Sequence, residues 1–213
     1  MLTIHHLGKS QSERIIWLCE ELGLPYELKR YNRDPVTMLA PPELKAVHPL
    51  GTAPVISDGE LVLAESGAII EYVIAKHGGG RLALGPSHPN LGDYLFWFHF
   101  GNGTLQPMMG RNAALRRANL PADNPTLVAT RGRLDHALNL VERRLGETPF
   151  FAGAELTAAD VMIVFSLTTM RHFMPLDLTP YPNILAYLGR VGARAAYKRA
   201  MEKGDPDMAP LLT

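Results

Sequence analysis

The tetrad Ser10-Gln11-Ser12-Glu13 carries the side chains of this sequence that are best suited to act on an anion. Its S-x-x-E pattern is that of a capping box, in which Ser10 would cap the following helix and Glu13 would bond back to it. A hydroxyl beside the unpaired N–H groups of a helix N-terminus can also stabilise an anion. If that anion were a ligand thiolate, the pKa of the thiol would fall and its nucleophilicity at neutral pH would rise. Ser12, in the same turn, is the second candidate for this hydroxyl.

Two further segments could hold an extended, peptide-like ligand. Pro54 precedes the apolar residues Val55 and Ile56, and it is either a tolerated first residue of a strand or a cis-proline in a tight turn. A cis bond would turn the flanking backbone groups outward to pair with such a ligand. Ser66 is a natural helix N-cap whose helix offers N–H groups to a carboxylate, whereas Glu65 could pair with an ammonium. A carboxylate site beside an ammonium site suits the amino-acid end of a ligand.

The single cysteine and the eight histidines are weaker candidates. Cys19 falls on the apolar stripe of a predicted helix, two turns after the N-terminus where a reactive cysteine is expected, so it is predicted to be a core residue. One cysteine excludes an intramolecular disulfide framework and a multi-cysteine zinc site. His5 and His6 are adjacent on a predicted strand, where successive side chains point to opposite faces. With no H-x-x-x-H pair beside an acid, we predict no metal site.

The charge balance argues against several classes of partner. Lys plus Arg number 21 and Asp plus Glu number 21, so the formal net charge is zero. A neutral chain has no general attraction for nucleic acid or for anionic membrane surfaces, so neither is expected as a partner. No apolar run reaches the 18 or more residues that span a bilayer, and the first residues do not fit a signal peptide. We therefore expect a soluble, cytoplasmic protein.

The segment that carries Ser10 is predicted to lie in a βαβ unit. Residues 2–7 and 26–31 are predicted strands. Between them, apolar residues at positions 15, 18, 19 and 22 have the i, i+3, i+4, i+7 spacing of a helix, which we expect to stop at Gly23. Such a crossover is right-handed and joins parallel strands.

The following segment is predicted to be antiparallel. Residues 54–57 and 60–63 form a hairpin in which Asp58-Gly59 is a two-residue turn, a pair that favours type I′. A helix then runs from Ser66 to the glycines at 78–80. The order βαβ-ββα builds one small mixed sheet covered by helices, and we assign residues 1–82 to this α/β domain.

No strand is predicted after residue 90. Helical periodicity marks residues 91–105, 127–145, 158–172 and 184–197. The tetrad Thr157-Ala158-Ala159-Asp160 fits a capping box with Asp in place of the final Glu or Gln. We expect a linker at 83–89 and an all-helical bundle domain at 90–213.

Taken together, these motifs resemble the cytosolic glutathione transferase family, bacterial-type serine-class members in particular, over essentially the whole chain. The resemblance implies a thioredoxin-like domain followed by an all-helical domain, usually in a homodimer. It implies a glutathione S-transferase that uses glutathione as co-substrate, without a metal, to attack electrophiles or peroxides. The segments that carry it are residues 7–28, 41–56, 58–73 and 150–167.

The resemblance also implies roles for single residues at the thiol end of glutathione. Ser10 matches the serine that stabilises the glutathione thiolate, with Ser12 as the alternative. Pro54 matches the cis-proline of the family. Ala53 and Val55 beside it would hold the cysteinyl part through backbone hydrogen bonds.

For the two ends of the tripeptide the resemblance implies charged partners. Glu65 and Ser66 match the pair that holds the γ-glutamyl amine and carboxylate. Lys45 falls where some classes place a basic residue for the glycine carboxylate, although a solvated lysine is the default for an exposed position.

A small, apolar electrophile is expected to bind between the two domains. The segment 96–109 is rich in aromatic and sulfur side chains that suit an adaptable apolar pocket, although ordinary helix packing explains most of them. Asn102, Gln106 and Met109 lie at i, i+4, i+7, so we predict that they share a face and line the pocket.

Two other functions fit the same residues. One is a non-catalytic relative that binds glutathione or a protein partner, but the presence of Ser10, Pro54, Glu65 and Ser66 favours catalysis. The other is a glutathione-disulfide oxidoreductase without an enzyme cysteine. A peroxidase or disulfide-reductase side activity would use the same site.

Overall fold

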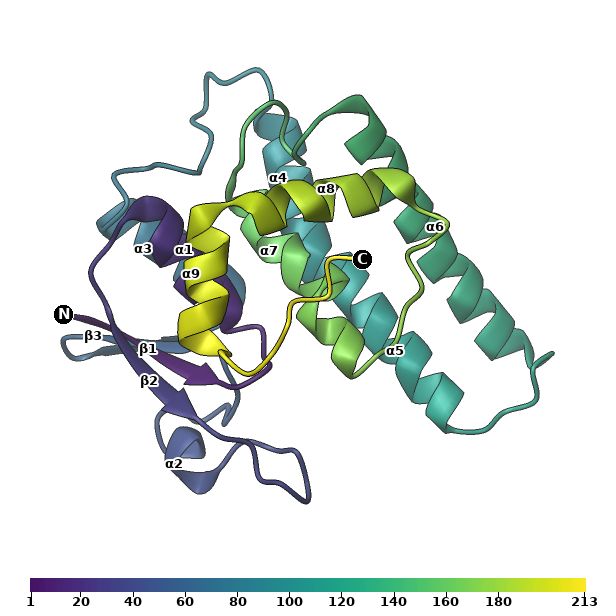
Figure 1. Cartoon of the computed structure of the whole chain (residues 1–213), viewed down its shortest axis with the longest axis horizontal. Helices are drawn as coiled ribbons and strands as arrows, with labels where there is room; N and C mark the ends of the chain where they lie inside the picture. Colours follow the sequence, from purple (N-terminus) through teal and green to yellow (C-terminus); the bar gives the residue numbers. More distant parts are fainter. The chain divides into compact units, whose positions relative to one another are not determined.

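The computed structural model describes residues 1–213 and divides into two compact units. The N-terminal unit consists of Met1–Ala83 and Gly192–Pro210. The helical unit consists of Leu84–Val191 and Leu211–Thr213. The sheet lies in the N-terminal unit, and the helical unit is built from helices (Figure 1).

The sheet has four strands in the order β2-β1-β3-β4. Strand β1 (Leu2–Leu7) pairs in parallel with β2 (Glu27–Tyr31) and antiparallel with β3 (Val55–Asp58). Strand β3 pairs antiparallel with β4 (Leu61–Ala64). Helix α1 (Glu13–Leu22) makes the crossover between β1 and β2. The predicted βαβ-ββα order is confirmed, and it puts the end of β1 next to the start of α1.

Helix α1 forms because its apolar residues recur on one face. The residues at 15, 18, 19 and 22 are all at most 3 % exposed. The helix stops at Gly23, which has φ +63° and whose neighbour Leu24 donates its N–H to the carbonyl of Cys19. Burial raises the pKa of the Cys19 thiol to about 12. Cys19 is therefore an unreactive core residue, as predicted.

The hairpin differs by one residue from the prediction. Asp58 pairs with Leu61, so the two loop residues are Gly59 and Glu60 instead of Asp58-Gly59. Gly59 has φ +64°, whereas Glu60 is not among the residues with positive φ. A type I′ turn needs positive φ at both loop positions, so the predicted turn type is wrong. A single glycine with positive φ at the first loop position is the pattern of type II′.

Two helices complete the first 83 residues. Helix α2 (Pro42–Lys45) is a single turn that the sequence patterns did not indicate, because four residues carry no usable periodicity. Helix α3 (Ser66–Lys76) begins at the predicted position and buries Ile69, Ile70 and Val73.

The C-terminal helix α9 (Ala195–Gly204) packs on α1 within the N-terminal unit. Trp17 and Tyr197 meet edge to face, with ring centroids 5.2 Å apart. Glu21 accepts from Arg194, and Glu20 accepts from both Arg199 and Lys203. These contacts are why Gly192–Pro210 falls in the N-terminal unit, whereas the sequence-based division assigned it to the helical domain.

The helical unit contains one long run of helix with a change of pitch. Here α4 (Leu91–Phe100) continues as a π-helical turn η1 (Gly101–Leu105) and then as α5 (Gln106–Arg117). Pro107 has no N–H to donate to a carbonyl of the preceding turn, which favours this irregularity. A Cβ at Gly101 would lie 2.9 Å from side-chain atoms of Met162 and Ile163, so glycine permits the close approach of helix α7 (Ala158–Leu167).

Three further helices and a 3₁₀ turn follow. The predicted helix 184–197 is wrong as a single element, because Arg194 adopts an extended conformation between α8 and α9. Helix α5 was not predicted, since Pro107 and Gly110 interrupt the periodicity. The bounds are α6 Pro125–Glu147, α7 Ala158–Leu167, η2 Thr169–His172 and α8 Pro182–Ala193.

The predicted capping box at the start of α7 forms. The backbone N–H of Thr157 donates to Asp160 Oδ2 at 2.8 Å, and Phe151 N–H and Tyr187 Oη donate to Asp160 Oδ1 at 3.1 Å each. Asp160 is fully buried. Burial raises its pKa to about 6, although these hydrogen bonds act in the opposite direction.

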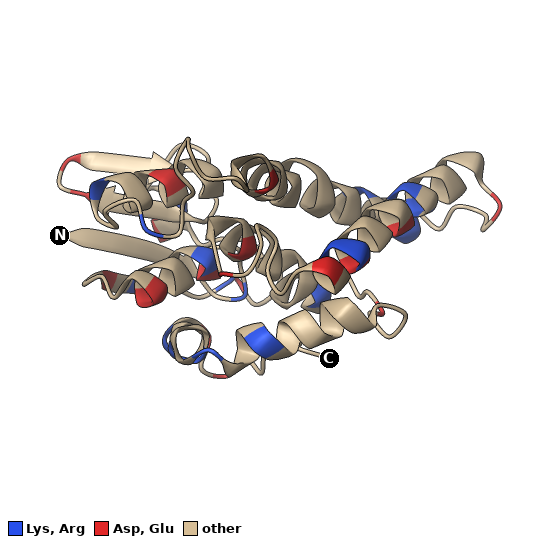
Figure 2. Ribbon diagram, turned by 90° about the horizontal axis from the view of Figure 1, so that it is seen from above, with Lys and Arg blue, Asp and Glu red and all other residues tan.

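Charged residues of both signs are scattered along the ribbon (Figure 2), in keeping with the zero net charge. None of the helices combines the length and apolar character that crossing a membrane requires.

Candidate active site

The turn between β1 and α1 does not form the capping box that Ser10 and Glu13 predict. The N-cap is Ser12, with φ −67° and ψ −16°, and no side chain caps the helix. Ser10 instead lies two residues earlier, where its backbone carbonyl accepts from the N–H of Glu13 at 3.1 Å. Its hydroxyl oxygen lies 2.7 Å from Ser12 Oγ and accepts from the N–H of Ser12 at 3.3 Å. The two serines therefore form a coupled pair of hydroxyls.

The pair continues into a buried chain of polar groups. Ser12 Oγ lies 2.9 Å from His6 Nδ1 and also accepts from the N–H of Leu7 at 3.3 Å. On the other side of the ring, His6 Nε2 lies 3.2 Å from Asp205 Oδ2, within ion-pair distance but without hydrogen-bond alignment. His6 and Ser12 have no exposed surface, and Ser10 and Asp205 are 6 % and 7 % exposed.

Asp205, just after α9, is held by a residue of the turn between β1 and α1. Its Oδ1 accepts from the N–H of Lys9 at 2.9 Å. Burial acts to raise the pKa of Asp205, but the close contact with the His6 ring, the N–H of Lys9 and the charge of Arg30 together hold it below its usual value. The carboxylate is thus kept ionised beside the buried His6 ring.

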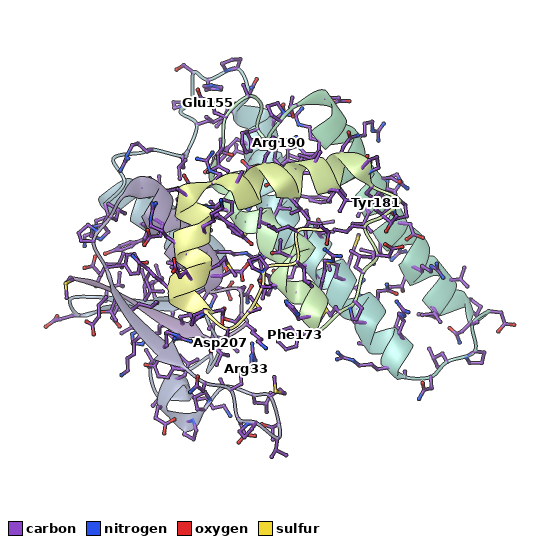
Figure 3. All side chains as sticks on the ribbon, in the orientation of Figure 1. Arg33, Glu155, Phe173, Tyr181, Arg190 and Asp207 are labelled. Atoms are coloured by element: carbon purple, nitrogen blue, oxygen red, sulfur yellow. The ribbon has the colours of Figure 1, made fainter.

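A cavity of about 310 Å³ in the N-terminal unit borders Asp205. Figure 3 labels two side chains of its lining, Arg33 and Asp207. Arg33 donates from Nε to the carbonyl of Gly8 and from Nη2 to that of Lys9. The lining includes the exposed residues Lys9 and Asp207, so the cavity connects Asp205 with solvent.

Gln11 and Arg14 connect the Ser10 turn to the two other predicted segments. Gln11 Nε2 donates to the carbonyl of Ala53 at 3.3 Å. Arg14 Nη1 donates to Gln11 Oε1 at 2.9 Å and to Ser66 Oγ at 3.3 Å. Arg14 is 1 % exposed, and burial lowers its pKa to about 9. The structure therefore links Ala53 and Ser66 by hydrogen bonds to Gln11, the residue next to Ser10 in the chain.

The Ala53–Pro54 peptide bond is cis, as the resemblance implies. It directly precedes β3, where Val55 pairs with His5 of β1 and Ala64 of β4. The side chains of Ala53 and Val55 are buried. Strand β3 is an inner strand, so its backbone groups pair with β1 and β4. Backbone groups that can bind a ligand must therefore come from the residues that precede β3.

Glu65 has an unusual backbone conformation. It is the N-cap of α3, with φ +74° and ψ 119°, and its side chain is exposed. Ser66 is therefore the first helical residue instead of the predicted N-cap. A non-glycine residue with positive φ is strained and is frequently found at functional sites. The first N–H groups of α3 lie at this position, where a helix offers donors to an anion.

The remaining predicted residues occupy two different environments. Lys45 is exposed at the end of α2. Met109 is buried and lines a cavity of about 260 Å³ in the helical unit, together with Phe173 of Figure 3. Asn102 and Gln106 are half-buried and do not line this cavity, because the π-helical turn between them shifts the spacing on which the shared face was predicted.

The cavity at Met109 is partly basic. Arg116 and Arg117 line it, and Arg117 Nη2 donates to the carbonyl of Phe173 at 2.9 Å. A second cavity of about 790 Å³ shares Asn112 and Arg116 with it and extends to Tyr181, also labelled in Figure 3.

Sequence reasoning missed several residues of the site. His6 and Asp205 are 199 positions apart in the chain, and no pattern links them. The one available signal was Arg14, a charged residue next to the apolar residue Ile15 in the predicted helix, since a buried charge needs a partner. The structure brings together no group of three or more His, Cys, Asp or Glu side chains that could hold a metal ion.

Comparison with protein families gives two matches that together span well over half of the chain. The glutathione S-transferase N-terminal domain matches residues 10–76, and the glutathione S-transferase C-terminal domain matches residues 112–190. The chain belongs to the glutathione S-transferase family. The first match begins at Ser10 and includes every predicted glutathione-binding residue.

Individual members of the glutathione S-transferase family are similar over nearly the whole chain. Glutathione S-transferase 3 of Schizosaccharomyces pombe is 29 % identical and covers 100 % of this chain and 92 % of its own. A glutathione S-transferase structure from Actinobacillus pleuropneumoniae is 33 % identical, covers 98 % of this chain and 97 % of its own, and superposes with a TM-score of 0.88. A delta-class glutathione transferase structure from Nilaparvata lugens is 27 % identical, with a TM-score of 0.75 over 96 % of this chain and 94 % of its own. The predicted family and fold are confirmed.

Proposed function

We propose that this glutathione transferase activates glutathione at Ser10. The Ser10 hydroxyl donates to the sulfur and holds it as a thiolate, which attacks an electrophilic carbon. The observation that carries this assignment is the position of the two serines. Ser12 Oγ is engaged inside the protein by His6, by Leu7 N–H and by Ser10, whereas Ser10 ends the chain of hydroxyls.

One hydroxyl at this position can supply the free energy that is needed to stabilise the glutathione thiolate. When Ser12 donates to Ser10 Oγ, the Ser10 proton is left to point at a ligand. Lowering a thiol pKa by about two units corresponds to about 2.7 kcal/mol. A hydrogen bond to a charged group supplies about 1.5–3 kcal/mol, and the N-terminal end of α1 adds to it.

The γ-glutamyl end of glutathione is proposed to bind at the start of α3. Its carboxylate would accept from the Ser66 hydroxyl and from the N–H groups of the first helical turn. Its ammonium would pair with the exposed carboxylate of Glu65, the N-cap of α3. The link from Ser66 through Arg14 to Gln11 supports one continuous binding surface with the Ser10 turn.

The cysteinyl and glycyl parts would follow the other two segments. Backbone groups of Ala53, next to the cis bond to Pro54, are proposed to pair with the cysteinyl peptide, and Val55 fixes this segment in the sheet. Gln11 already connects Ala53 to the Ser10 turn. Lys45 is proposed to attract the glycine carboxylate as an exposed point charge.

The electrophile is proposed to enter the cavity at Met109. Its apolar lining of Met109, Leu134, Phe173 and Met174 suits a small apolar group, and sulfur-containing side chains adapt to different shapes. Arg116 at the same cavity favours electrophiles that also carry a negative charge.

The assembly and location follow from the family. A homodimer in the cytoplasm is proposed because cytosolic members of this family usually form one. Exposed apolar residues on the edge strand β4, Leu61 and Val62, and on α4, Leu95 and Phe96, are consistent with a partner that covers them.

The test is glutathione-affinity retention followed by turnover of a generic aromatic halide. Ser10→Ala should still be retained but should lose about 100-fold in kcat, since removal of one donor to a developing or bound anion typically costs about 10²–10³. Ser12→Ala should lose less, because Ser10 keeps its own proton. Ser57→Ala, a partly buried serine that is bonded to His5, is the matched control and should keep wild-type turnover.

Two results would reverse the assignment. Unchanged turnover in Ser10→Ala would remove Ser10 from the chemistry, and a larger loss in Ser12→Ala would transfer the role to Ser12. Retention on glutathione without turnover of any electrophile or peroxide would favour the binding-protein alternative.

A further inference from the structure

The chain of groups that leads from Ser10 into the protein has an end that can accept a proton. It runs from Ser10 Oγ over 2.7 Å to Ser12 Oγ and over 2.9 Å to His6 Nδ1. The far side of the ring faces the Asp205 carboxylate, with 3.2 Å between Nε2 and Oδ2. A serine, a histidine and a carboxylate in this order can move a proton away from a nucleophile.

We propose that His6 receives the thiol proton of glutathione through Ser10 and Ser12, and that Asp205 stabilises the imidazolium that forms. The proposal rests on the contact between Ser10 and the sulfur proposed above. His6 and Asp205 do not touch the substrate, so they are positioning residues that act through the two serines.

The hydrogen bonds of the chain have a defined direction before the transfer. With Nδ1 of His6 unprotonated, Ser12 donates to Nδ1 and Ser10 donates to Ser12. Ser10 Oγ then keeps a lone pair for the S–H of the incoming glutathione. In this state Ser10 offers the sulfur an acceptor, which suits a thiol and not a thiolate.

The transfer reverses every bond of the chain. The S–H bond breaks and its proton goes to Ser10 Oγ, while the Ser10 proton moves to Ser12 Oγ and the Ser12 proton forms an N–H bond at His6 Nδ1. Atoms and charge balance, because one thiolate and one imidazolium replace a neutral thiol and a neutral ring. Afterwards Ser12 donates to Ser10, and Ser10 donates to the thiolate. The same transfer that creates the anion therefore turns a donor toward it.

A carboxylate lies beside the His6 ring, and a cavity borders that carboxylate. Asp205 is kept ionised, and Lys9 N–H fixes its other oxygen at 2.9 Å. The charges of Arg30 and Arg33 act on this carboxylate, and Lys9 and Asp207 line the cavity beside it; the cationic groups limit the attraction that the imidazolium feels. Gly204 leaves room for the ring, since a Cβ there would lie 3.3 Å from His6 Nε2. The cavity next to Asp205 gives the proton a later route to solvent.

A comparison with the neighbouring His5 shows that this arrangement is specific. His5 is also buried on β1, but its two nitrogens lie 2.9 Å from Tyr31 Oη and 2.9 Å from Ser57 Oγ. Burial, together with the charge of Lys29, lowers the pKa of His5, and the charge of Glu27 opposes this only in part. His5 is thus a neutral, structural histidine of the same strand and a matched control.

The experiment counts protons and thiolates separately. Glutathione is added to the full-length protein in weak buffer between about pH 5 and 8, where histidines titrate. Ultraviolet absorbance measures the thiolate formed per site, and an indicator dye measures the protons released. Wild type and His5→Asn should release clearly less than one proton per thiolate in the neutral part of this range.

His6→Asn should release one proton per thiolate, because the amide can donate to Ser12 but cannot bind a proton. Its bound thiol should have a pKa about one unit higher, so that about tenfold less thiolate is present at any pH well below this pKa. Asp205→Asn, which leaves the ring in place, should shift both readouts in the same direction by a smaller amount. It serves as the second variant if His6→Asn does not fold.

Two outcomes would overturn the proposal. One is release of one proton per thiolate by wild type over the whole range. The other is a retained proton that is the same in wild type and in both variants. Ser10→Ala distinguishes failure of the proton relay from failure of the Ser10 assignment. An unchanged thiol pKa in Ser10→Ala refutes the contact between Ser10 and the sulfur. A raised thiol pKa in Ser10→Ala, together with unaltered proton counts in His6→Asn, refutes the relay alone.

Discussion

Two tetrads of this chain have the same sequence pattern but different structures. Ser10-Gln11-Ser12-Glu13 and Thr157-Ala158-Ala159-Asp160 both fit a capping box. At α7 the box closes, and Asp160 bonds the N–H groups of Thr157 and Phe151. At α1 it does not close, and Ser10 joins a chain that ends at Asp205.

The partners of the polar side chains distinguish the structural tetrad at α7 from the tetrad at α1. In the α7 tetrad Asp160 accepts from the backbone N–H of Thr157, which completes the box, and also from Phe151 N–H and Tyr187 Oη, so its oxygens act as buried structural acceptors. In the α1 tetrad the hydroxyls are linked to a histidine and a carboxylate from other parts of the chain. The tetrad that closes its box stabilises the helix it starts, whereas the tetrad that leaves its box open keeps a hydroxyl, that of Ser10, for chemistry.

Asp160→Ala is expected to give the largest effect on stability. It leaves the N–H groups of Phe151 and Thr157 buried without their acceptor, and each such loss costs about 1–3 kcal/mol, so the free energy of unfolding should fall by about 3 kcal/mol or more. Chemical denaturation followed by circular dichroism measures this. Asp135→Ala, an exposed aspartate on α6, is the control and should change little. A loss below about 1 kcal/mol would show that the α7 box is not structural.

The pH dependence of the same site should have a defined sign. Burial raises the pKa of Asp160 to about 6, so between about pH 4 and 6 the folded protein binds more protons than the unfolded chain. Stability of wild type relative to Asp160→Asn should therefore decrease by roughly 2–3 kcal/mol as the pH rises through this window. Thermal unfolding of both proteins across the window measures the difference. A constant difference would mean that Asp160 is not perturbed.

Thr157→Ala should have an intermediate effect. Loss of an N-cap side chain costs about 0.5–2 kcal/mol, and Thr157 would keep the backbone bond to Asp160. The measurement compares the denaturant midpoints of wild type and Thr157→Ala, provided that the dependence of the unfolding free energy on denaturant is the same in both. An effect as large as that of Asp160→Ala would place the structural role in the threonine instead.

Ser10→Ala should have the smallest effect on stability, at most about 1 kcal/mol, because the Ser12 hydroxyl keeps His6 as a partner. The same denaturation experiment measures it. If Ser10→Ala destabilised the protein as much as Asp160→Ala, Ser10 would be structural and the contrast between the two tetrads would fail.

Much of the N-terminal unit could be predicted because its signals are local. The stripe at positions 15, 18, 19 and 22 defines α1, and the alternation of strand and turn residues defines the hairpin. The hairpin turn was displaced by one residue because Asp-Gly and Gly-Glu compete for the two loop positions, and pairing of β3 with β1 decides between them.

The parts that could not be predicted depend on contacts between distant residues. No pattern links His6 with Asp205, which the packing of α9 on α1 brings together. The face of Asn102, Gln106 and Met109 was derived from a regular helix, and the π-helical turn at Gly101–Leu105 breaks that spacing. The roles of Ser10, Ala53, Glu65 and Ser66 came from resemblance to the family, and the framework through Gln11 and Arg14 supports them as one site.

The most direct test of the account is the pKa of the glutathione thiol when it is bound to wild type and to Ser10→Ala, measured by ultraviolet titration of the thiolate. The bound thiol in Ser10→Ala should have a pKa about one to two units above that in wild type, since a hydrogen bond to a charged group is worth about 1.5–3 kcal/mol. An equal pKa in the two proteins would contradict the claim that the Ser10 hydroxyl holds the thiolate.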